Sequence, residues 1–207
     1  MGLVCQCPQS AAIETIPEVT CLERFGEIQK IIIQRTKNGA VLNNIVIATN
    51  DPTLLATWNT LKGATDSEKV QITPYIAEMT NDDVEPREAG SVGIGGIAAI
   101  LGSEFTPANG YFHDVPQSII KKIRKYNCEV GVSVFLVNEA GQIGGIADDN
   151  ESATTFRGIP VRSFFVGNKI FGGRNDVDKN RIMWKYEPDW SDEFYVITPA
   201  FDPLSEL

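Results

Sequence analysis

The second half of the chain is a succession of short apolar segments separated by turn-forming residues, and this pattern limits the fold more than any other feature of the sequence. Strands are predicted at residues 130–137, 142–147, 156–166, 181–187 and 193–198. Asn-Glu-Ala-Gly at 138–141 and Pro-Asp-Trp-Ser-Asp at 188–192 are typical turn sequences. Consecutive strands joined by short turns favour antiparallel pairing over a parallel sheet. We therefore predict a mainly β fold, an antiparallel β-sandwich or barrel with two short flanking α-helices.

A β-hairpin is predicted at residues 28–48. Residues 28–35 and 41–48 are apolar and rich in β-branched side chains, and Asn38-Gly39 lies between them. Asn-Gly pairs favour tight hairpin turns because both central residues of such a turn have positive φ. We expect the two segments to pair with each other across this turn.

Residues 1–20 differ from the rest of the chain. Pro8 and Pro17 interrupt them and no apolar period is sustained, which indicates an extended arm. The first ten residues have neither the basic start nor the apolar run of a secretory signal. No apolar run approaches the roughly 18 residues that a membrane span needs. We expect an arm over 1–20, a single β-rich domain over 21–207, and no membrane partner.

Two short amphipathic helices are predicted from apolar residues at helical spacing. Asp51 and Pro52 are placed to begin the first helix, and Asp114 and Gln117 to cap the second. The apolar face of the first helix consists of Leu54, Leu55, Trp58 and Leu61. The apolar face of the second consists of Ile119, Ile120, Ile123 and Tyr126. Between the helices, residues 70–79 predict a strand broken by Pro74, as at a sheet edge or bulge.

The charges are distributed unevenly. With 18 basic and 27 acidic residues the net charge is -9, which disfavours sequence-specific DNA binding. The exposed face of the second helix has four cations, Lys121, Lys122, Arg124 and Lys125. The densest acidic stretch contains Glu78, Asp82, Asp83, Glu85 and Glu88. A solvated face matched to the helix dipole is one interpretation of the cations. Docking of this face on the acidic stretch of another copy is the other.

Residues 90–102 are rich in glycine, with Gly93, Gly95 and Gly96 close together. A glycine loop of this kind can bind the phosphates of a dinucleotide. However, the G-x-G-x-x-G spacing fails, and no Lys-Ser/Thr pair completes a P-loop. The pattern instead predicts an apolar segment where two backbones approach closely.

The sequence gives no positive support for catalysis, so we expect no enzyme and no cofactor. His113 is the single histidine, and no nucleophile motif lies near it. The four cysteines are too few and too unevenly spaced for a disulfide scaffold and lack the repeated pairs of a zinc motif. They fit a reducing compartment.

One set of oxygen-bearing residues has the spacing of a calcium loop. Asp176, Asp178, Asn180 and Glu187 occupy its first, third, fifth and twelfth places. The sixth place is Arg181, where that loop needs glycine. A polar turn is therefore the favoured interpretation, no metal is expected, and a cation at these residues stays the alternative.

Four short stretches of the second half of the chain form a set of distinctive motifs. They are Val-Pro-Gln-Ser-Ile-Ile at 115–120, Ser-Phe-Phe-Val-Gly-Asn at 163–168, Asp-Lys-Asn at 178–180, and Pro-Asp-Trp-Ser-Asp at 188–192 with Tyr195. Together they resemble virion proteins of tailed bacteriophages that infect gut Bacteroidetes, with tail-tube-like proteins as the best fit. The resemblance implies a virion subunit that is assembled in the host cytoplasm with other virion proteins. Its copies would form stacked rings, for example hexamers, around a channel through which DNA passes without sequence-specific binding.

Assembly between copies is the function that the residues and the resemblance both favour. A closed ring needs two different complementary patches on each subunit. The 1–20 arm and the 28–48 hairpin are expected to make such contacts. The candidate contact residues are Ile31, Ile33, Arg35, Asn38, Gly39, Val41, Lys121, Lys122, Arg124, Lys125, Asp82, Asp83 and Glu85.

Two other functions stay open from the sequence. One is a capsid-decorating or connector-ring protein of the phage head, which would bind a preformed shell. The other is a ligand-binding β domain, for which an exposed set of aromatic residues could bind carbohydrate. That set is Trp184, Trp190, Phe194 and Tyr195. Aromatic residues in strands are more often part of the core or of an interface.

Overall fold

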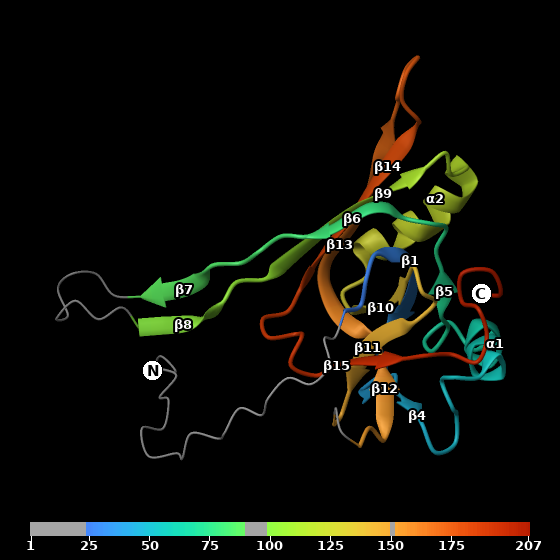
Figure 1. Ribbon diagram of the computed structural model, residues 1–207, viewed down its shortest axis with the longest axis vertical. Coiled ribbons are helices and arrows are strands. Elements are labelled where there is room, and N and C mark those ends of the chain that lie inside the picture. The colour runs from blue at the N-terminus through green and yellow to red at the C-terminus, as the bar shows by residue number, and fades with distance from the viewer. Residues whose placement is uncertain (1–23, 90–98, 150–151) are drawn as a thin grey trace.

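The computed structural model describes residues 24–89, 99–149 and 152–207 and consists mainly of antiparallel β-strands (Figure 1). The strands of the first half are β1 (Ile28–Arg35), β2 (Lys37–Asn38), β3 (Val41–Leu42), β4 (Ile45–Val46), β5 (Gln71–Ile72), β6 (Ala77–Asn81), β7 (Pro86–Ala89), β8 (Ala99–Ser103) and β9 (Thr106–His113). The strands of the second half are β10 (Val132–Asn138), β11 (Ile143–Ala147), β12 (Thr155–Arg157), β13 (Ile159–Ile170), β14 (Lys179–Tyr186) and β15 (Phe194–Ile197). The helices are α1 (Leu55–Gly63), α2 (Gln117–Ile123) and the 3₁₀ helix η1 (Arg124–Cys128). The predicted mainly β class with two short α-helices is confirmed.

The main sheet divides into two branches at β10. One edge of β10 pairs with β1 over its whole length. The other edge pairs first with β13, through Val132 to Val134, and then with β11, through Leu136 and Val137. One branch continues from β13 through β14 and β9 to β6, and the other passes from β11 to β12 and β4, with β15 on the second edge of β11. Eleven of the described strands therefore form one large branched sheet that does not close into a barrel, while β2–β3 and β7–β8 form separate two-stranded sheets.

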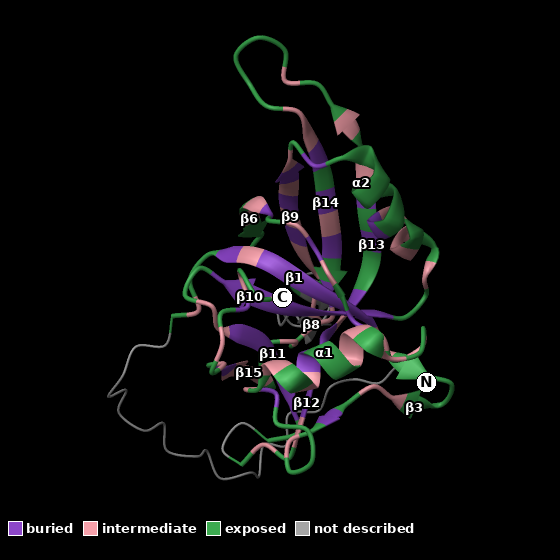
Figure 2. Cartoon of the chain, turned by 90° about the vertical axis from the view of Figure 1, so that its right-hand side faces the viewer, coloured by how far each residue is buried: buried purple, intermediate pink, exposed green. Residues whose placement is uncertain are grey.

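Strands β1 and β10 are buried on both faces, as Figure 2 shows. Ile31 and Ile33 of β1 belong to the core cluster that includes α2, β9, β13 and β14. Ile32 points to the opposite face and joins a second cluster with Trp58 of α1 and Phe156 of β12. A strand covered on both sides needs apolar residues at successive positions, which explains the unbroken isoleucine run.

The predicted hairpin over 28–48 is wrong in its pairing. A turn does form at Gly39, whose φ is 62°, but it joins only the two-residue strands β2 and β3. Strand β1 pairs with β10 and β5, and β4 pairs with β12. The reason is burial: both edges and both faces of β1 are occupied by core elements, so pairing with distant strands displaces the local partner.

Helix α1 forms near the predicted position but without the predicted cap. Asp51 Oδ1 accepts hydrogen bonds from the backbone amide and the hydroxyl of Thr53, at 2.9 and 2.7 Å, and so forms a turn before the helix. The N-cap position itself is Leu54, which makes no side-chain cap hydrogen bond. Trp58 is fully buried, and its Nε1 donates to the carbonyl of Pro52 at 2.8 Å. The buried tryptophan therefore fixes the helix to the chain that enters it.

Helix α2 likewise lacks a side-chain cap. Its N-cap position is Pro116, and Asp114 has a φ of 51° and does not cap the helix. Ile120 and Ile123 are buried in the core as predicted, whereas Ile119 is 38% exposed. The helix therefore packs through a narrower apolar face than predicted, and Ile119 lies at the surface.

Most predicted turns and strands of the second half are confirmed. The 138–141 turn joins β10 to β11, with Gly141 at a φ of 75°. The predicted 156–166 strand is divided at Gly158 into β12 and β13, because these pair with different strands, β11 and β10. Residues 71–81 form β5 and β6 on either side of Pro74, as predicted. The predicted 1–20 arm and the 93–96 glycines lie outside the described residues.

Candidate assembly surfaces

A two-stranded β-arm projects from the body of the molecule (Figure 1). It is the continuation of the β6–β9 hairpin, since β6 leads into β7 and β8 leads into β9. The register is nearly continuous: Asn81 is opposite Ala108 in the body, and Pro86 is opposite Ser103 in the arm. Among the described strands, β7 and β8 pair only with each other. At about 3.3 Å per residue, the eight steps from Asn81 to Ala89 extend about 26 Å.

Strand β8 of the arm contains no charged residue, whereas β7 contains Arg87 and Glu88. An isolated two-stranded ribbon is at best marginally stable in water, and it becomes stable when further strands or a packed face are added. The arm is therefore a candidate assembly element.

The β13–β14 hairpin forms a second projection, at the top of Figures 1 and 2. Its end exposes three apolar side chains: Ile170 is 45%, Phe171 79% and Val177 38% exposed. We call residues 170–177 the apolar tip. Such a cluster is a second candidate contact surface.

The calcium-like set lies at the base of this tip but is not arranged as a cation site. Asp178 forms an ion pair with Lys169 at 2.9 Å, and Asp176 forms one with Lys179 at 3.6 Å. Hydrogen bonds from Lys169 and from the Gly172 amide lower the pKa of Asp178. No group of three or more His, Cys, Asp or Glu side chains within the described ranges is placed to hold a metal ion. Both aspartates are thus paired with neighbouring lysines.

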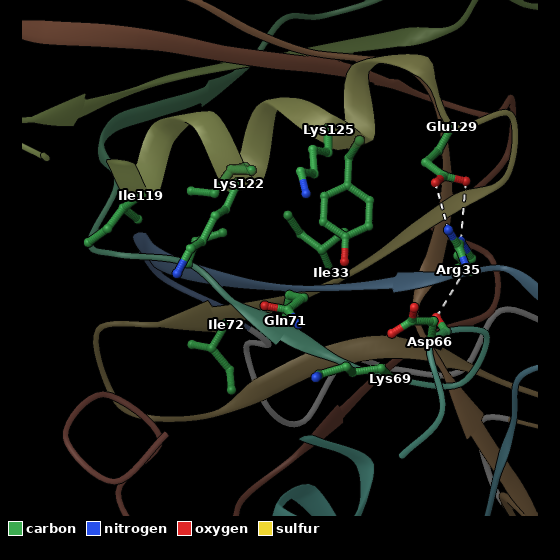
Figure 3. Close-up of a pocket in the computed structure, with 13 residues that line it drawn as sticks. Ile33, Arg35, Asp66, Lys69, Gln71, Ile72, Ile119, Lys122, Lys125 and Glu129 are labelled. Atoms are coloured by element: carbon green, nitrogen blue, oxygen red, sulfur yellow. Dashed lines mark hydrogen bonds and ion pairs between the residues drawn. The ribbon is translucent and has the colours of Figure 1, made fainter. Parts of the chain in front are cut away.

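A groove of about 520 Å³ lies between α2–η1 and strand β5 (Figure 3). Ile119, Lys122 and Lys125 line it from the helical side. Gln71 and Ile72 line it from β5, which pairs with β1 alone and so has an edge without a strand partner in the described part of the chain. The groove is thus bounded by an open sheet edge on one side and a basic helix on the other.

Three lysines give this groove its positive charge. Lys122 and Lys125 point into it from the helical side, and Lys69 points into it from β5's side (Figure 3). None of the three has an ion-pair partner among the described side chains. The lining contains four cations and two anions, a net charge of +2 in a chain of net charge -9. We call this feature the lysine groove.

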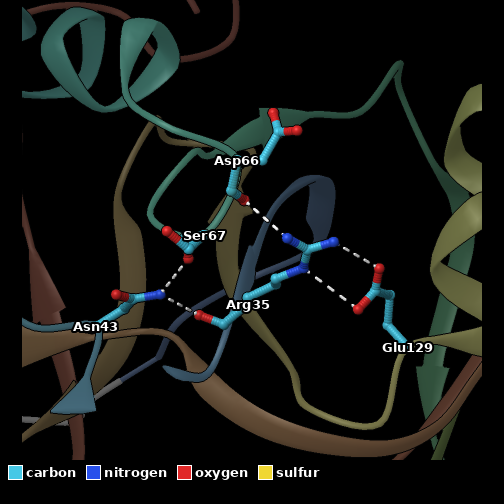
Figure 4. A network of polar contacts seen from close by, with 5 residues as sticks. All are labelled: Arg35, Asn43, Asp66, Ser67 and Glu129. Carbon is cyan, nitrogen blue, oxygen red and sulfur yellow. Dashed lines mark hydrogen bonds and ion pairs between the residues drawn. The ribbon is translucent and has the colours of Figure 1, made fainter. Parts of the chain in front are cut away.

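One end of the lysine groove is closed by a polar network (Figure 4). Arg35 donates two hydrogen bonds to Glu129, at 2.8 and 3.2 Å, and a third to the carbonyl of Asp66 at 3.3 Å. Asn43 donates to the carbonyls of Arg35 and Ser67, at 2.8 and 2.7 Å. The bond from Arg35 lowers the pKa of Glu129. A two-point arginine–carboxylate pair has a fixed geometry, so this end of the groove is preorganised.

The predicted contact residues of the 28–48 segment separate into two groups. Ile31 and Ile33 are fully buried in the core and have no surface left for a neighbouring subunit. Arg35 is engaged by Glu129, while Asn38 donates to Glu68 at 2.9 Å. Gly39 is exposed, and Val41 is 71% exposed. Of these candidate contact residues, the exposed ones, Asn38, Gly39 and Val41, all belong to the β2–β3 turn.

The predicted charged residues are mostly exposed. Lys121, Lys122 and Lys125 lie at the surface, but Arg124 is half-buried and donates to the carbonyl of Gly167 at 2.7 Å. Asp82, Asp83 and Glu85 are exposed in the link between β6 and β7, at the base of the arm. We call residues 82–85 the acidic link.

Sequence reasoning missed the arm and the lysine groove. The sequence signal nearest to the arm is the glycine-rich run at 90–102, which predicts a close approach of two backbones. The groove had no sequence signal, because Lys69 and the two helix lysines Lys122 and Lys125 are brought together only by the fold.

The aromatic residues proposed for carbohydrate binding belong largely to the interior. Trp184 is fully buried and Tyr186 stacks on Trp190 with ring centroids 4.3 Å apart. Trp190 contacts Phe194 edge-on at 5.7 Å. These rings pack against the first core cluster. They stabilise the branch of the main sheet that contains β13, β14 and β9, and they do not form an exposed binding platform.

The single histidine is placed at the end of β9. The Nε2 atom of His113 is buried without a hydrogen-bond partner among the described residues. His113 thus lies at the junction of β9 and α2.

None of the helices in the described ranges has the length and apolar character that crossing a bilayer requires.

Comparison with known proteins gives one structural match. No protein-family model matches the chain, and no curated protein matches its sequence. A chain in the six-fold symmetrised cryo-EM structure of the anti-feeding prophage baseplate is similar to this one at 9% identity and a TM-score of 0.32. The match covers 91% of this chain and 100% of that chain. A TM-score this low assigns neither fold nor function.

Proposed function

We propose that this protein is a structural subunit of a tailed-bacteriophage particle, and that its copies assemble into tail-tube-like rings through the β7–β8 arm. The observation that supports this most strongly is the arm itself. It extends about 26 Å beyond the sheet at about 3.3 Å per residue, and its strand β8 contains no charged residue. A ribbon of this kind gains stability when a neighbouring subunit covers it or adds a strand to it.

The rest of the molecule fits an assembling subunit. The main sheet is anchored by two core clusters, so it provides a rigid base for the two projections, the arm and the apolar tip. The sequence resemblance to virion proteins in the second half of the chain points to the same class. The net charge of -9 suits a channel wall to which passing DNA does not adhere.

Removing the arm tests this function. In the variant, residues 87–102 are replaced by Asn-Gly, which joins the paired residues Pro86 and Ser103 by a tight turn. The full chain is expected to form rings or tubes as its concentration rises, as measured by light scattering and negative-stain images. The arm-deleted chain is expected to stay monomeric.

Thermal unfolding of the arm-deleted chain provides the control for folding. Since β7 and β8 pair only with each other, their removal should leave the unfolding transition of the body in place. A full chain that stays monomeric at every concentration, or an arm-deleted chain that assembles as the full chain does, would overturn the proposal.

A further inference from the structure

We infer that the lysine groove is the docking site for the acidic link of a second copy of this chain. The inference rests on the proposed function, because it names the contact by which one subunit recognises the next. It commits to a single occupant, residues 82–85 of the neighbouring copy, and assigns the groove between α2 and β5 as the receiving surface.

The groove has the chemistry to receive an acidic segment. Lys69, Lys122 and Lys125 place three ammonium groups around it, and none of them forms an ion pair with a side chain among the described residues. Ile72 and Ile119 add apolar contact area on the two walls. An anionic segment with some apolar surface would therefore gain both charge pairing and burial there.

The acidic link has the matching properties. Asp82, Asp83 and Glu85 are exposed, and none forms an ion pair with a described side chain. Asp83 accepts a hydrogen bond only from the adjacent amide of Val84, at 2.9 Å, and Asp82 accepts a long one from Asn109, at 3.4 Å. Three carboxylates thus remain available for the three ammonium groups of the groove.

The two surfaces lie on different sides of the molecule. In Figure 1, α2 and β5 lie at the right, and the chain passes from β6 into the arm toward the left. The link is held by β6, which pairs with β9, so it does not reach the groove of its own chain. Pairing of two different patches is head-to-tail, and it closes into a ring when the rotation per subunit is suitable.

The groove fits an acidic protein segment better than nucleic acid. Its lining includes Asp66 and Glu129, and the chain around it has a net charge of -9, which repels a long polyanion. A short segment with three carboxylates meets only the local charge of the groove. Binding of duplex DNA that depends on the groove lysines would overturn the inference.

Charge exchange tests the contact. Lys122→Glu with Lys125→Glu in the full chain should weaken assembly at least about tenfold, as should Asp82→Lys with Asp83→Lys. Combining all four substitutions restores the opposite charges and should recover assembly. Lys121→Glu is the matched control, because Lys121 lies on the same helix but does not line the groove. Light scattering over a concentration series gives the association constant, and urea unfolding confirms that each variant folds.

The outcomes separate this inference from the proposed function. If the groove variant assembles normally while the arm-deleted chain stays monomeric, the groove contact is wrong and the assembling function stands. If the variant that combines all four substitutions does not recover assembly, the acidic link is the wrong occupant. The same conclusion follows if deletion of residues 1–23 weakens assembly as the groove substitutions do and the acidic-link substitutions have no effect. A full chain that never assembles overturns both.

Discussion

At the scale of single residues, two consecutive glycines of β11 lie very close to their neighbours. A Cβ atom on Gly145 would lie 2.6 Å from the carbonyl oxygen of Arg157 and 2.7 Å from Cε2 of Phe156. On Gly144 it would lie 2.6 Å from Cζ of Phe194. Side chains and strands on both sides of β11 thus approach the backbone itself, which only glycine allows.

Gly145→Ala should therefore destabilise the protein by about 1–3 kcal/mol, because the obstructing atom is a backbone oxygen that cannot rotate away. Gly167→Ala is the matched control, since its nearest neighbour would lie at an ordinary 3.6 Å. Urea unfolding monitored by tryptophan fluorescence measures both. Equal stability of the two variants would contradict this account of β11.

The sequence predicts few of these residue-scale details. It places glycine in the β11 segment but does not show which atoms approach it. It also gives no sign that Lys30, between isoleucine positions of β1, is buried with its ammonium group 4.7 Å from the ring centre of Tyr75. Burial lowers the pKa of Lys30. Such pairings are set by contacts between residues far apart in the chain.

At the scale of elements, both α-helices begin without a side-chain cap. The N-cap of α1 is Leu54, whose φ and ψ of -99° and 134° are suitable for a capping residue, and whose side chain is 48% exposed. The first amides of the helix therefore lack the acceptor that Ser, Thr, Asp or Asn would provide. Packing of Trp58 against Phe135, with ring centroids 5.1 Å apart, holds the helix instead.

Leu54→Asp should raise the free energy of unfolding by about 0.5–1.5 kcal/mol, because the carboxylate can accept from the free amides and favours the positive end of the helix dipole. Leu54→Ala removes the same apolar surface without supplying an acceptor, and it should not stabilise the protein. Chemical unfolding of the two variants decides the matter, and equal stabilities would contradict the capping argument.

Strand positions were predictable from the sequence, whereas strand partners were not. Turn residues such as Asn38-Gly39 and Gly141 identify where strands end. The partner of β1 is β10, about a hundred residues later in the chain, and nothing in residues 28–35 distinguishes that partner from the adjacent 41–48 segment. Likewise, the lysine groove brings Lys69 and the side chains of α2 together, although they are far apart in the sequence. Local patterns determine elements, and burial of the whole chain determines their neighbours.

At the scale of the whole molecule, several carboxylates are held in their charged form by hydrogen bonds. Bonds from Thr154 and the Thr155 amide strongly lower the pKa of Asp148. The hydroxyl and amide of Thr53 lower the pKa of Asp51, and the hydroxyl of Ser205 with the Leu204 amide lowers that of Asp202. A carboxylate whose pKa is lowered on folding stabilises the fold above its unfolded pKa, and that contribution is lost as the pH falls through the folded pKa.

The free energy of unfolding should therefore decrease as the pH falls below about 4, the range of unfolded carboxylates. Urea unfolding between neutral and acidic pH measures this slope. Asp148→Asn should be less stable than the parent at neutral pH, and its stability should depend less on pH in the acidic range. A parent chain with constant stability through that range, or an unchanged slope in Asp148→Asn, would contradict the assignment.

The continuity of the arm with the sheet has a mechanical consequence. Strand β8 leads into β9, and β9 pairs with β14 from Thr106–Tyr186 to His113–Lys179. Hydrogen bonds between antiparallel strands are perpendicular to the strand direction. A pull on the arm along that direction therefore loads the whole β9–β14 ladder in shear, so its bonds resist together instead of opening one after another. A neighbour holding the arm would transmit tension into the most extensively paired part of this branch.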